Sequence, residues 1–590
     1  MKRIVLFFLL FIAVSLWGIV IPAGNVHGNW TIADSPYFID GNITIVADAT
    51  LEIEAGVEIY FNDVYSLVVN GRLLAVGTET DSILISCIEA SLGWQGIRFY
   101  DTNTNGLEGS ILQYCHLEKG TAIGTGDDAN GGAVYCNNSG NVLIENCYFF
   151  QNYSAWDGGA VYLGNGSDNL VTNCLFTANS CGFYGAGMIV YGSAPVLERC
   201  DFIGNSSSVF AAGFSAWNNA APELYNCRFI DNFAGACAGI YGVSSTITLA
   251  NVLFINNNTQ YGSGGAIGLT SCNTAASNVT IIDNESTLSG GAFWINSGHL
   301  DLYNSILWGN LPEEIALAGT GSATVSNCCI QDGFEGDNIL EDDPLFLDAA
   351  EYDLHLEETS PCIDYGDATL PEFTLPEFDF DGLARIMDGD GDGDAQIDLG
   401  IYEYEFIMFY EPPAHLNIEA TTGFVTWEAP SQEGLTGYCI YLDGDMLAEI
   451  TETEYQLTGL IDGVEYIVAL KAMYEGGESE LVTATFIYIQ TAAGEDELAG
   501  IINHGNYPNP FNPSTQICFT TLRSGIVDLT VYNLQGKRVI NLINGELAAG
   551  IHQINWNGKD ESNKVVGSGV YLYKIQTVST KVSGRMILLK

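Results

Sequence analysis

Basic residues are scarce in this sequence: Lys and Arg together number 18, against 72 Asp and Glu, for a formal net charge of −54. Binding of nucleic acid requires Lys and Arg to neutralise phosphates, so the lack of a basic patch excludes nucleic acid as a partner. The same charge repels anionic membranes and anionic glycans and favours solubility. The net charge alone therefore argues against nucleic acids, anionic membranes and anionic glycans as partners.

Long helical periodicity is also missing, because no stretch keeps apolar residues at helical spacing over several turns. Instead, 67 Gly residues and 11% aromatic residues accompany a hydrophobic fraction of 47%. Gly-rich, aromatic-rich chains with little Lys are typical of all-β structure with many turns. We expect an all-β protein, and the length suggests roughly three to five domains.

A single long apolar run is present, at the N-terminus. Lys2 and Arg3 precede the apolar stretch from Ile4 to Ile21, in the order of a secretory signal. The motif "IPAG" at 21–24 offers a cleavage region, so residues 1–23 are predicted to be a signal peptide. An uncleaved signal anchor is the alternative, since the run approaches the length of a membrane span. We expect no transmembrane segment in the mature chain.

A unit of 26 or 27 residues repeats along the first half of the chain. A small residue in motifs such as "GGAVY" marks seven units: Ala133, Ala160, Gly187, Gly213, Gly239, Ala266 and Ala292. Repeats of this length indicate a solenoid, and each unit has room for three short strands and three bends. We expect parallel strands stacked about 4.8 Å apart, with a right-handed coil.

Each repeat contains a short motif of the type "NCRFIDN" (226–232), with Cys or another small or apolar residue at its second position. Asparagine recurs at the last position of this motif, five residues after the Cys. The seven residues are Asn152, Asn179, Asn205, Asn232, Asn257, Asn284 and Asn310. Asn tolerates left-handed backbone and its amide bonds nearby backbone, and stacked amides can bond along a stack of strands. We predict an asparagine ladder at this corner, and a second one at the Asn that precedes the Cys position.

Cysteine numbers 15, and several Cys occupy one position of the repeat. We interpret this column as small buried hydrophobic residues. A disulfide between neighbouring coils is an alternative, because their Cα atoms come within disulfide range. A zinc site is another, although one thiol per coil does not converge on a tetrahedral centre.

The "GGAVY … NCxFxxN" unit resembles the right-handed parallel β-helix repeats of pectate-lyase-like proteins, over roughly residues 29–350. The resemblance implies a right-handed, three-strand-per-coil parallel β-helix, which we assign to residues 29–405. That family includes lyases, hydrolases and surface proteins without catalysis, so the fold alone does not fix an activity.

Aromatic residues recur two positions after the small residue that marks each repeat. They alternate with apolar residues that point into the core, so we expect the aromatic side chains on the outer side of the strand. These are the predicted ligand-binding residues: Tyr135, Tyr162, Tyr241 and Trp294. Amphipathic rings of this kind can contact sugars at an exposed surface. The alternative is the ordinary preference of Tyr for strands.

Candidate catalytic groups are few. Asp231 and Asp283 occupy equivalent positions two coils apart, about 10 Å, which is a marginal separation for an inverting hydrolase. A lyase would be expected to use acidic residues that bind calcium and a Lys or Arg base, but basic residues are rare between 29 and 405. One of them, Arg228, stacks on Asp201 of the preceding coil and suits a cross-strand ion pair. We expect no catalysis.

An acidic loop follows the repeats, in "DFDGLARIMDGDGDGDAQIDLGIYEY" (379–404). Its alternating carboxylates match the first half of a calcium loop, without the final Glu. We predict a calcium site formed by Asp388, Asp390, Asp392, Asp394 and Asp398. A solvated acidic loop is the alternative.

The second half of the chain loses the repeat. Residues 410–490 resemble a fibronectin type III domain, with Trp427 on a strand and the Leu460, Gly463, Tyr466 spacing of a tyrosine corner. Residues 491–504 are a polar linker. Residues 505–590, with "NYPNPFNPST" at their start, resemble the immunoglobulin-like C-terminal sorting domain of the type IX secretion system.

Together these features predict a bacterial protein that is secreted or held at the outer cell surface. Its β-helix would serve adhesion or the binding of a polysaccharide or cell-surface glycan, and its C-terminal domain would engage the secretion machinery. A polysaccharide lyase or glycoside hydrolase, and a structural envelope protein without a ligand, are the alternatives.

Overall fold

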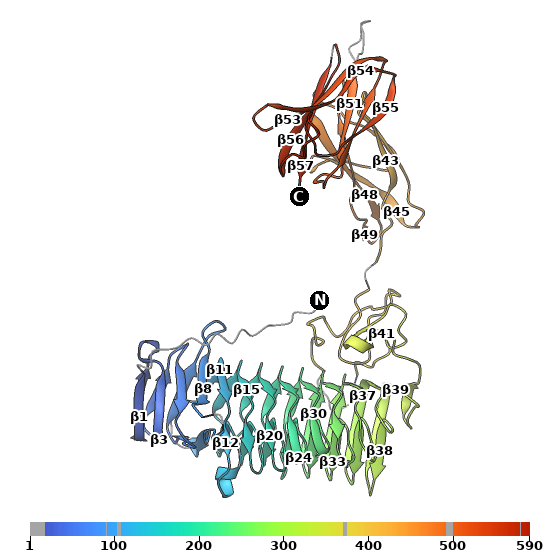
Figure 1. The fold of residues 1–590 in the computed structure, drawn as a ribbon. Helices are drawn as coiled ribbons and strands as arrows, with labels where there is room; N and C mark the ends of the chain where they lie inside the picture. Colours follow the sequence, from blue (N-terminus) through green and yellow to red (C-terminus); the bar gives the residue numbers. More distant parts are fainter. Residues whose placement is uncertain are drawn as a thin grey trace. The chain divides into compact units, whose positions relative to one another are not determined.

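The computed structural model describes residues 18–89, 91–102, 108–369, 375–406, 408–490, 500–578 and 580–589. These residues form strands, turns and short 3-10 segments, with no α-helix among them, and so none that could cross a membrane. Most of the expected signal peptide and residues 491–499 of the expected linker lie outside the described residues. The chain divides into two compact units, Met1–Met408 and Phe409–Lys590, which are considered separately (Figure 1).

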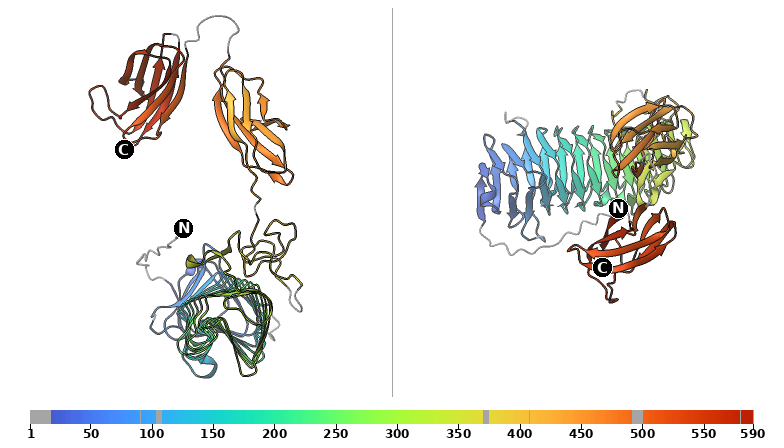
Figure 2. Two further views of the ribbon diagram at one scale, coloured as in Figure 1. Left: turned by 90° about the vertical axis from the view of Figure 1, so that its right-hand side faces the viewer. Right: turned by 90° about the horizontal axis from the view of Figure 1, so that it is seen from above.

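The first unit is a parallel β-solenoid with three long faces, seen end-on in Figure 2. Face A consists of β6 (Leu67–Val69), β9 (Ile97–Tyr100), β13 (Val134–Asn137), β17 (Val161–Gly164), β21 (Met188–Tyr191), β25 (Phe214–Trp217), β29 (Ile240–Val243), β33 (Ile267–Thr270), β36 (Phe293–Asn296) and β38 (Ile315–Ala318). Face B consists of β2 (Gly28–Trp30), β4 (Thr50–Ile53), β7 (Arg72–Val76), β10 (Ser110–Gln113), β14 (Val142–Glu145), β18 (Leu170–Thr172), β22 (Val196–Glu198), β26 (Glu223–Tyr225), β30 (Thr246–Ala250) and β34 (Asn273–Ser277).

Face C consists of β5 (Glu58–Phe61), β8 (Ile83–Cys87), β11 (Cys115–Glu118), β15 (Tyr148–Phe150), β19 (Leu175–Thr177), β23 (Asp201–Ile203), β27 (Arg228–Ile230), β31 (Leu253–Ile255), β35 (Thr280–Ile282) and β40 (Asp337–Leu340). Four strands span two faces: β1 (Ile19–Asn25), β3 (Tyr37–Ile45), β37 (His299–Trp308) and β39 (Ser322–Ile330). A short fourth sheet joins face C to face A: β12 (Thr121–Ala122), β16 (Tyr153–Ser154), β20 (Ser180–Cys181), β24 (Ser206–Phe210), β28 (Phe233–Ala236) and β32 (Asn258–Thr259).

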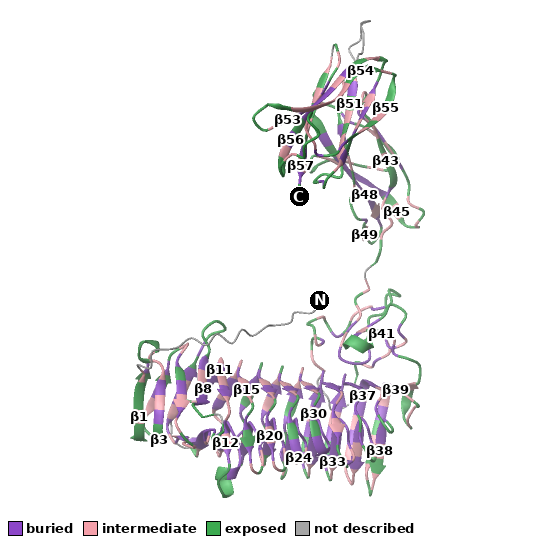
Figure 3. Cartoon of the chain, viewed as in Figure 1, coloured by how far each residue is buried: buried purple, intermediate pink, exposed green. Residues whose placement is uncertain are grey.

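Buried residues recur along the strands of the solenoid (Figure 3), and similar side chains occupy equivalent core positions from coil to coil. Phe149, Phe176, Phe202, Phe229 and Phe254 pair in register, and their rings stack with centroids between 4.6 and 4.9 Å apart. All five are fully buried. Burial of stacked aromatic surface on this scale is the main stabilising term for such a fold.

From β9 to β31, the long strands of the three faces are followed by a residue with left-handed backbone. Between faces B and C this residue is Asn in most coils, for example Asn146 (φ 52°), Asn173 (φ 51°) and Asn226 (φ 53°). Asn adopts this conformation more readily than other non-Gly residues. The bend between faces B and C is therefore caused by the local backbone conformation at this residue.

A return segment, residues 341–406, leaves the last coil and packs against the outer side of face C. It contains β41 (Phe346–Asp348), η4 (Ala349–Glu351) and β42 (Asp353–Leu356). Leu354 and Ile401 of the segment pack against Leu253, Ile255 and Ile282 of face C. The last coils are thus covered on a side that earlier coils leave open.

Corner asparagines hold the return segment in place. Nδ2 of Asn278 donates to the carbonyl oxygens of Asp398 (3.3 Å) and Gly400 (3.2 Å), and Nδ2 of Asn304 donates to that of Asp367 (3.0 Å). Within this second Asn column, Nδ2 of Asn251 donates to Oδ1 of Asn226 (3.0 Å). The predicted second ladder therefore serves here mainly as a set of donors to a neighbouring segment.

A buried ion pair fastens the same segment. Arg385 and Glu403 are both almost fully buried, with Nη1 2.6 Å from Oε1. Arg385 also donates to Oδ1 of Asn251 and to the carbonyl oxygen of Ile401. The guanidinium thereby connects both ends of the acidic loop to the solenoid.

The second unit contains two antiparallel two-sheet domains. In the first, β43 (Ala414–Glu419), β44 (Phe424–Glu428) and β47 (Glu454–Gln456) form one sheet, and β45 (Leu435–Leu442), β46 (Asp445–Ile450), β48 (Glu465–Tyr474), β49 (Gly477–Glu478) and β50 (Val482–Ile487) form the other. The predicted tyrosine corner is confirmed, because the Tyr466 hydroxyl accepts a hydrogen bond from the backbone N–H of Ile461 (2.9 Å).

The second of these domains follows residue 500. One sheet contains β51 (Ile501–Tyr507), β52 (Thr515–Thr521) and β55 (Gly550–Trp556), and the other contains β53 (Gly525–Asn533), β54 (Arg538–Leu547), β56 (Gly569–Gln576) and β57 (Lys581–Leu588). Trp556 and Tyr573 are buried in its core. The chain is all-β throughout its described residues, with a parallel solenoid followed by two β-sandwiches, and this confirms the predicted fold class.

Candidate functional site

Seven asparagines form a continuous hydrogen-bonded column at the corner after face C. Nδ2 of Asn152 donates to Oδ1 of Asn179 (3.0 Å), and the same bond repeats to Asn205, Asn232, Asn257, Asn284 and Asn310 at 2.8 to 3.0 Å. Each receiving Oδ1 also accepts the backbone N–H of the preceding Asn, at 3.0 Å for Asn152. Every amide group is used inside the scaffold, which leaves none for a ligand.

The predicted ligand-binding residues Tyr135 and Tyr162 lie on face A and stack on each other, with centroids 5.0 Å apart. Tyr135 is only 2% exposed. It is flanked on its other side by Tyr100 and by the guanidinium of Arg98, 5.4 Å from the ring centroid. Burial raises the pKa of both hydroxyl groups above the usual value. These rings offer little free face to a ligand.

Tyr241 and Trp294, the other two predicted binding residues, differ from each other in their surroundings. Tyr241 is 8% exposed and stacks on Phe210 at 4.6 Å. Trp294 is half-buried, and its register neighbours on the coils before and after it are Gly268 and Ala316, which carry no ring. Trp294 is therefore not stacked between rings of the neighbouring coils, although it packs against the cluster that contains Cys237 and Tyr241.

Two exposed aromatic residues that the sequence reasoning did not single out lie beside face A. Trp156 is 47% exposed and Phe183 is 43% exposed. They occupy successive coils in register, since the backbone N–H of Phe183 donates to the carbonyl of Trp156 (3.0 Å). The signal was present in "WDGGA" and "FYGAG", where an aromatic residue stands four positions before the small marker.

A carboxylate follows Trp156 directly. Burial raises the pKa of Asp157 to about 6. Its Oδ1 is buried and has no hydrogen-bond partner among the described residues. A buried, unpartnered carboxylate oxygen is costly, so a donor from a ligand would relieve an existing deficit.

The weak catalytic candidates Asp231 and Asp283 both have left-handed backbone, with φ of 55° and 54°, and lie at the corner beside the asparagine column. Asn256 occupies the intervening coil and donates its Nδ2 to Oδ1 of Asp231 (2.5 Å). Burial raises the pKa of Asp283 above its usual range. The structure places an amide between the two carboxylates rather than bringing them together around a substrate. The Asp201–Arg228 ion pair expected one coil away is confirmed, at 2.5 Å.

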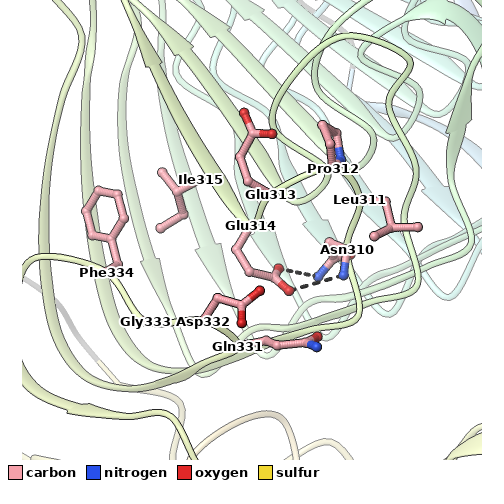
Figure 4. A pocket seen from close by; sticks show the side chains of 10 residues that line it. All are labelled: Asn310, Leu311, Pro312, Glu313, Glu314, Ile315, Gln331, Asp332, Gly333 and Phe334. Carbon is pink, nitrogen blue, oxygen red and sulfur yellow. Dashed lines mark hydrogen bonds between the residues drawn. The ribbon is translucent and has the colours of Figure 1, made fainter.

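A pocket of about 210 Å³ lies at the end of the asparagine column, lined by Asn310, Leu311, Glu314, Asp332 and Phe334 among others (Figure 4). Both carboxylate oxygens of Glu314 are engaged by Asn310. Burial raises the pKa of Glu314 to about 7, and the nearby charges of Asp332 and Asp283 act in the same direction. The Glu314 side chain ends the asparagine column, and both of its oxygens already accept hydrogen bonds from Asn310.

The acidic loop brings two of the five predicted calcium ligands, Asp388 and Asp390, together with a third carboxylate that was not predicted. Ligand atoms of Asp364, Asp388 and Asp390 lie within 4.8 Å of one another. Asp364, which sequence spacing did not reveal because it is 24 residues upstream, has an Oδ1 that is buried and finds no hydrogen-bond partner in the described part of the chain. This oxygen fits the hard-oxygen environment that Ca²⁺ prefers.

The remaining predicted ligands have other roles. Oδ1 of Asp392 accepts the N–H of Asp394 (2.8 Å), which is a local turn. Asp398 is buried, and its oxygens accept the N–H groups of Asp364 (2.7 Å) and Tyr404 (2.5 Å). Burial raises the pKa of Asp398 to about 6. Asp394 lies on the exposed part of the loop.

The architecture defines a β-solenoid protein with appended sandwich domains. Residues 74–254 match the family described as "Right handed beta helix region", which establishes the handedness expected from the repeat. Residues 519–581 match the family described as "FlgD Ig-like domain". No curated protein matches the chain.

Similar solved structures resemble only parts of the chain. The dimeric latent PorU of Porphyromonas gingivalis is 12% identical, covers 33% of this chain and is itself covered to 22%, with a TM-score of 0.17. A two-domain fibronectin type III segment of chicken tenascin is 19% identical over 30% of this chain and 99% of its own, with a TM-score of 0.13. SGBP-B of the Bacteroides ovatus mixed-linkage glucan utilization locus, in complex with a mixed-linkage heptasaccharide, is 11% identical over 32% of this chain and 46% of its own, with a TM-score of 0.14. Likenesses this weak do not bear on function.

Proposed function

We propose that this chain is a secreted or surface-held bacterial protein that binds a polysaccharide along face A of its β-helix, without catalysis. The observation that carries the proposal is the group Trp156, Asp157 and Phe183. Two exposed rings on adjacent coils stand beside a carboxylate oxygen that lacks a partner.

The chemistry of this group suits a sugar. The C–H face of a pyranose packs on an aromatic ring, while its hydroxyl groups need polar acceptors. The Asp157 carboxyl group, whose residue is only partly buried, would supply such an acceptor directly after Trp156. Trp294 adds a further partly exposed ring on the same face. Because the chain carries a net charge of −54, we expect an uncharged rather than an anionic glycan.

A glycan array probed with the secreted chain tests this proposal. Wild-type protein is expected to bind neutral polysaccharides, and Trp156→Ala combined with Phe183→Ala is expected to lower the signal at least tenfold. Phe233→Ala is the matched control, because Phe233 is also 47% exposed but lies on β28 of a later coil. Absence of binding to every glycan would favour a purely structural envelope protein. Release of oligosaccharides, lost in Asp231→Asn, would favour an enzyme.

The C-terminal domain, residues 505–590, is proposed to direct export through the type IX secretion machinery. The support is the "NYPNPFNP" entrance motif and the immunoglobulin-like fold matched over 519–581. Deletion of 505–590 should leave the protein inside the cell envelope of a host that carries this machinery, while the full chain reaches the exterior. Normal secretion of the truncated chain would refute the assignment.

Calcium is proposed as a structural ion of the acidic loop. Asp364, Asp388 and Asp390 would hold it, and it would neutralise three carboxylates beside the return segment. Titration calorimetry with CaCl₂ is expected to show binding that Asp364→Asn abolishes. Asp392→Asn is the control, because Asp392 lies on the same loop but is not one of the three carboxylates that converge. Equal calcium affinity in the two variants would show that Asp364, Asp388 and Asp390 do not form a calcium site.

A further inference from the structure

Most of the first strand of the solenoid, residues 19–23 of β1, lies inside the segment expected to be removed as a signal peptide. Strand β1 (Ile19–Asn25) pairs in parallel with β3, with Ile19 opposite Tyr37 and Ile21 opposite Ile39. The backbone N–H of Ile19 donates to the carbonyl of Pro36 (3.1 Å), just outside the strand pair. β1 thus forms the outermost layer of the solenoid at this end.

The side chains of β1 cover part of the core. Ile21 packs against the core, and beneath it Tyr37, Ile39 and Ile43 of β3 are at most 2% exposed. A cut in the "IPAG" region would remove the strand that covers these residues. It would expose a long apolar edge strand with unpaired backbone groups, which is a template for aggregation.

The small residues of "IPAG" have a packing role that does not involve a peptidase. Gly41 of β3 has φ of 151°, and a Cβ placed on it would come within 2.6 Å of the Ala23 side chain. A close approach of the two strands at this point therefore requires small residues on both. The motif that suggested cleavage is explained by the contact between β1 and β3.

We propose that the leader is cut between Ser15 and Leu16, so that the mature chain keeps β1. The sequence before that bond has the features of a secretory leader: Lys2 and Arg3, an apolar stretch from Ile4 to Ile12, and small residues at Ala13 and Ser15. Hydrolysis consumes one water, leaves the carboxylate on Ser15 and frees the α-amino group of Leu16. The mature chain then reaches the start of β1 within three residues.

The test is the N-terminus of the exported protein. The full chain is expressed from its own Met1 in a diderm bacterium, recovered from beyond the inner membrane, and analysed by intact mass and N-terminal peptide sequencing. Leu16 is the expected first residue. A first residue at Ile21 or later, or a retained Met1, would overturn the proposal.

Two variants sharpen this test. Ser15→Gln places a bulky residue directly before the proposed bond and is expected to lower the processed fraction at least tenfold. Ala23→Gln alters the competing region to a similar degree and is expected to leave processing unchanged. The reverse pattern would place the cut at Ala23 or Gly24 and would show that the mature solenoid begins at β2.

Discussion

Asn310 donates its Nδ2 to Oε2 of Glu314 at 2.6 Å and its backbone N–H to Oε1 at 3.1 Å, so a carboxylate ends a column that carboxamides build. Elsewhere in the column, one Oδ1 of the next Asn accepts both bonds. At the last position the solenoid has no further Asn, and Glu314, four residues later, folds back to take its place.

Glu314 should make stability depend on pH. Burial raises its pKa from 4.5 to about 7, so the folded state holds a proton that the unfolded state loses between these values. Stability is then greatest below about pH 4.5 and falls as the pH rises to about 7, by up to about 3 kcal/mol.

Glu314→Gln should reduce this slope by the part that Glu314 contributes, since a single amide oxygen can accept both bonds from Asn310 as Asn residues do elsewhere in the column. Asp157 and Asp398, whose pKa values burial raises to about 6, keep their own contributions. Thermal unfolding of the solenoid at pH 5, 6, 7 and 8 measures the effect. Glu313→Gln is the control, because Glu313 is exposed. An unchanged slope in Glu314→Gln would show that another group titrates.

Substitution in the middle of the asparagine column should be severe. Asn205 is fully buried, and its Nδ2 donates to Asn232 (3.0 Å) and to the carbonyl of Phe176 (2.9 Å). Asn205→Ala leaves several buried groups unsatisfied, at about 1–3 kcal/mol each, so we expect a loss of at least about 3 kcal/mol. Urea unfolding measures it. Asn258→Ala, at a partly exposed position on β32, should cost less than about 1 kcal/mol; similar losses would contradict the role of the column.

The return segment should loosen when its buried cation is removed. Arg385→Met leaves Glu403 buried without its ion-pair partner, a loss of about 3–5 kcal/mol. Hydrogen exchange should then rise across residues 341–406, while face A keeps its protection. Arg199→Met is the matched control, because the Arg199–Glu198 pair is exposed and contributes little. Global unfolding in Arg385→Met would mean that the segment is required for the solenoid itself.

The cysteines should all be thiols. Fifteen are present without a disulfide, and every one except Cys518 is buried. Burial raises the pKa of Cys237 and Cys136 well above the usual value, which suppresses the reactive thiolate. Thiol titration in denaturant should count 15 groups, and very few should react in the folded state. A count below 15 would reveal a bond between neighbouring coils.

The repeat made most of the solenoid predictable, because each coil meets the same neighbours and local spacing therefore determines the tertiary contacts. Phe229 stacks on Phe202 and Phe254 for the same reason that the motif recurs every 25 to 27 residues. The ion pair between Asp201 and Arg228 followed in the same way. The exposed pair Trp156 and Phe183 was missed, since a strand alternation pattern does not describe residues at a corner.

Contacts between segments far apart in the chain could not be predicted from the sequence. Asp364 joins Asp388 and Asp390 only because the return segment folds back on itself, and Arg385 meets Asn251 across 134 residues. Neither contact is marked in the sequence by a repeat spacing or by a local motif.

The sequence by itself determined the all-β class, the stack of coils and the asparagine column, since these depend on side chains repeated at fixed intervals. The tertiary structure decided which rings stay accessible, which carboxylates meet, and that Ile19–Asn25 forms a strand of the first coil. Accessibility and convergence depend on which segment covers which face, and that is set by packing between parts of the chain far apart in sequence.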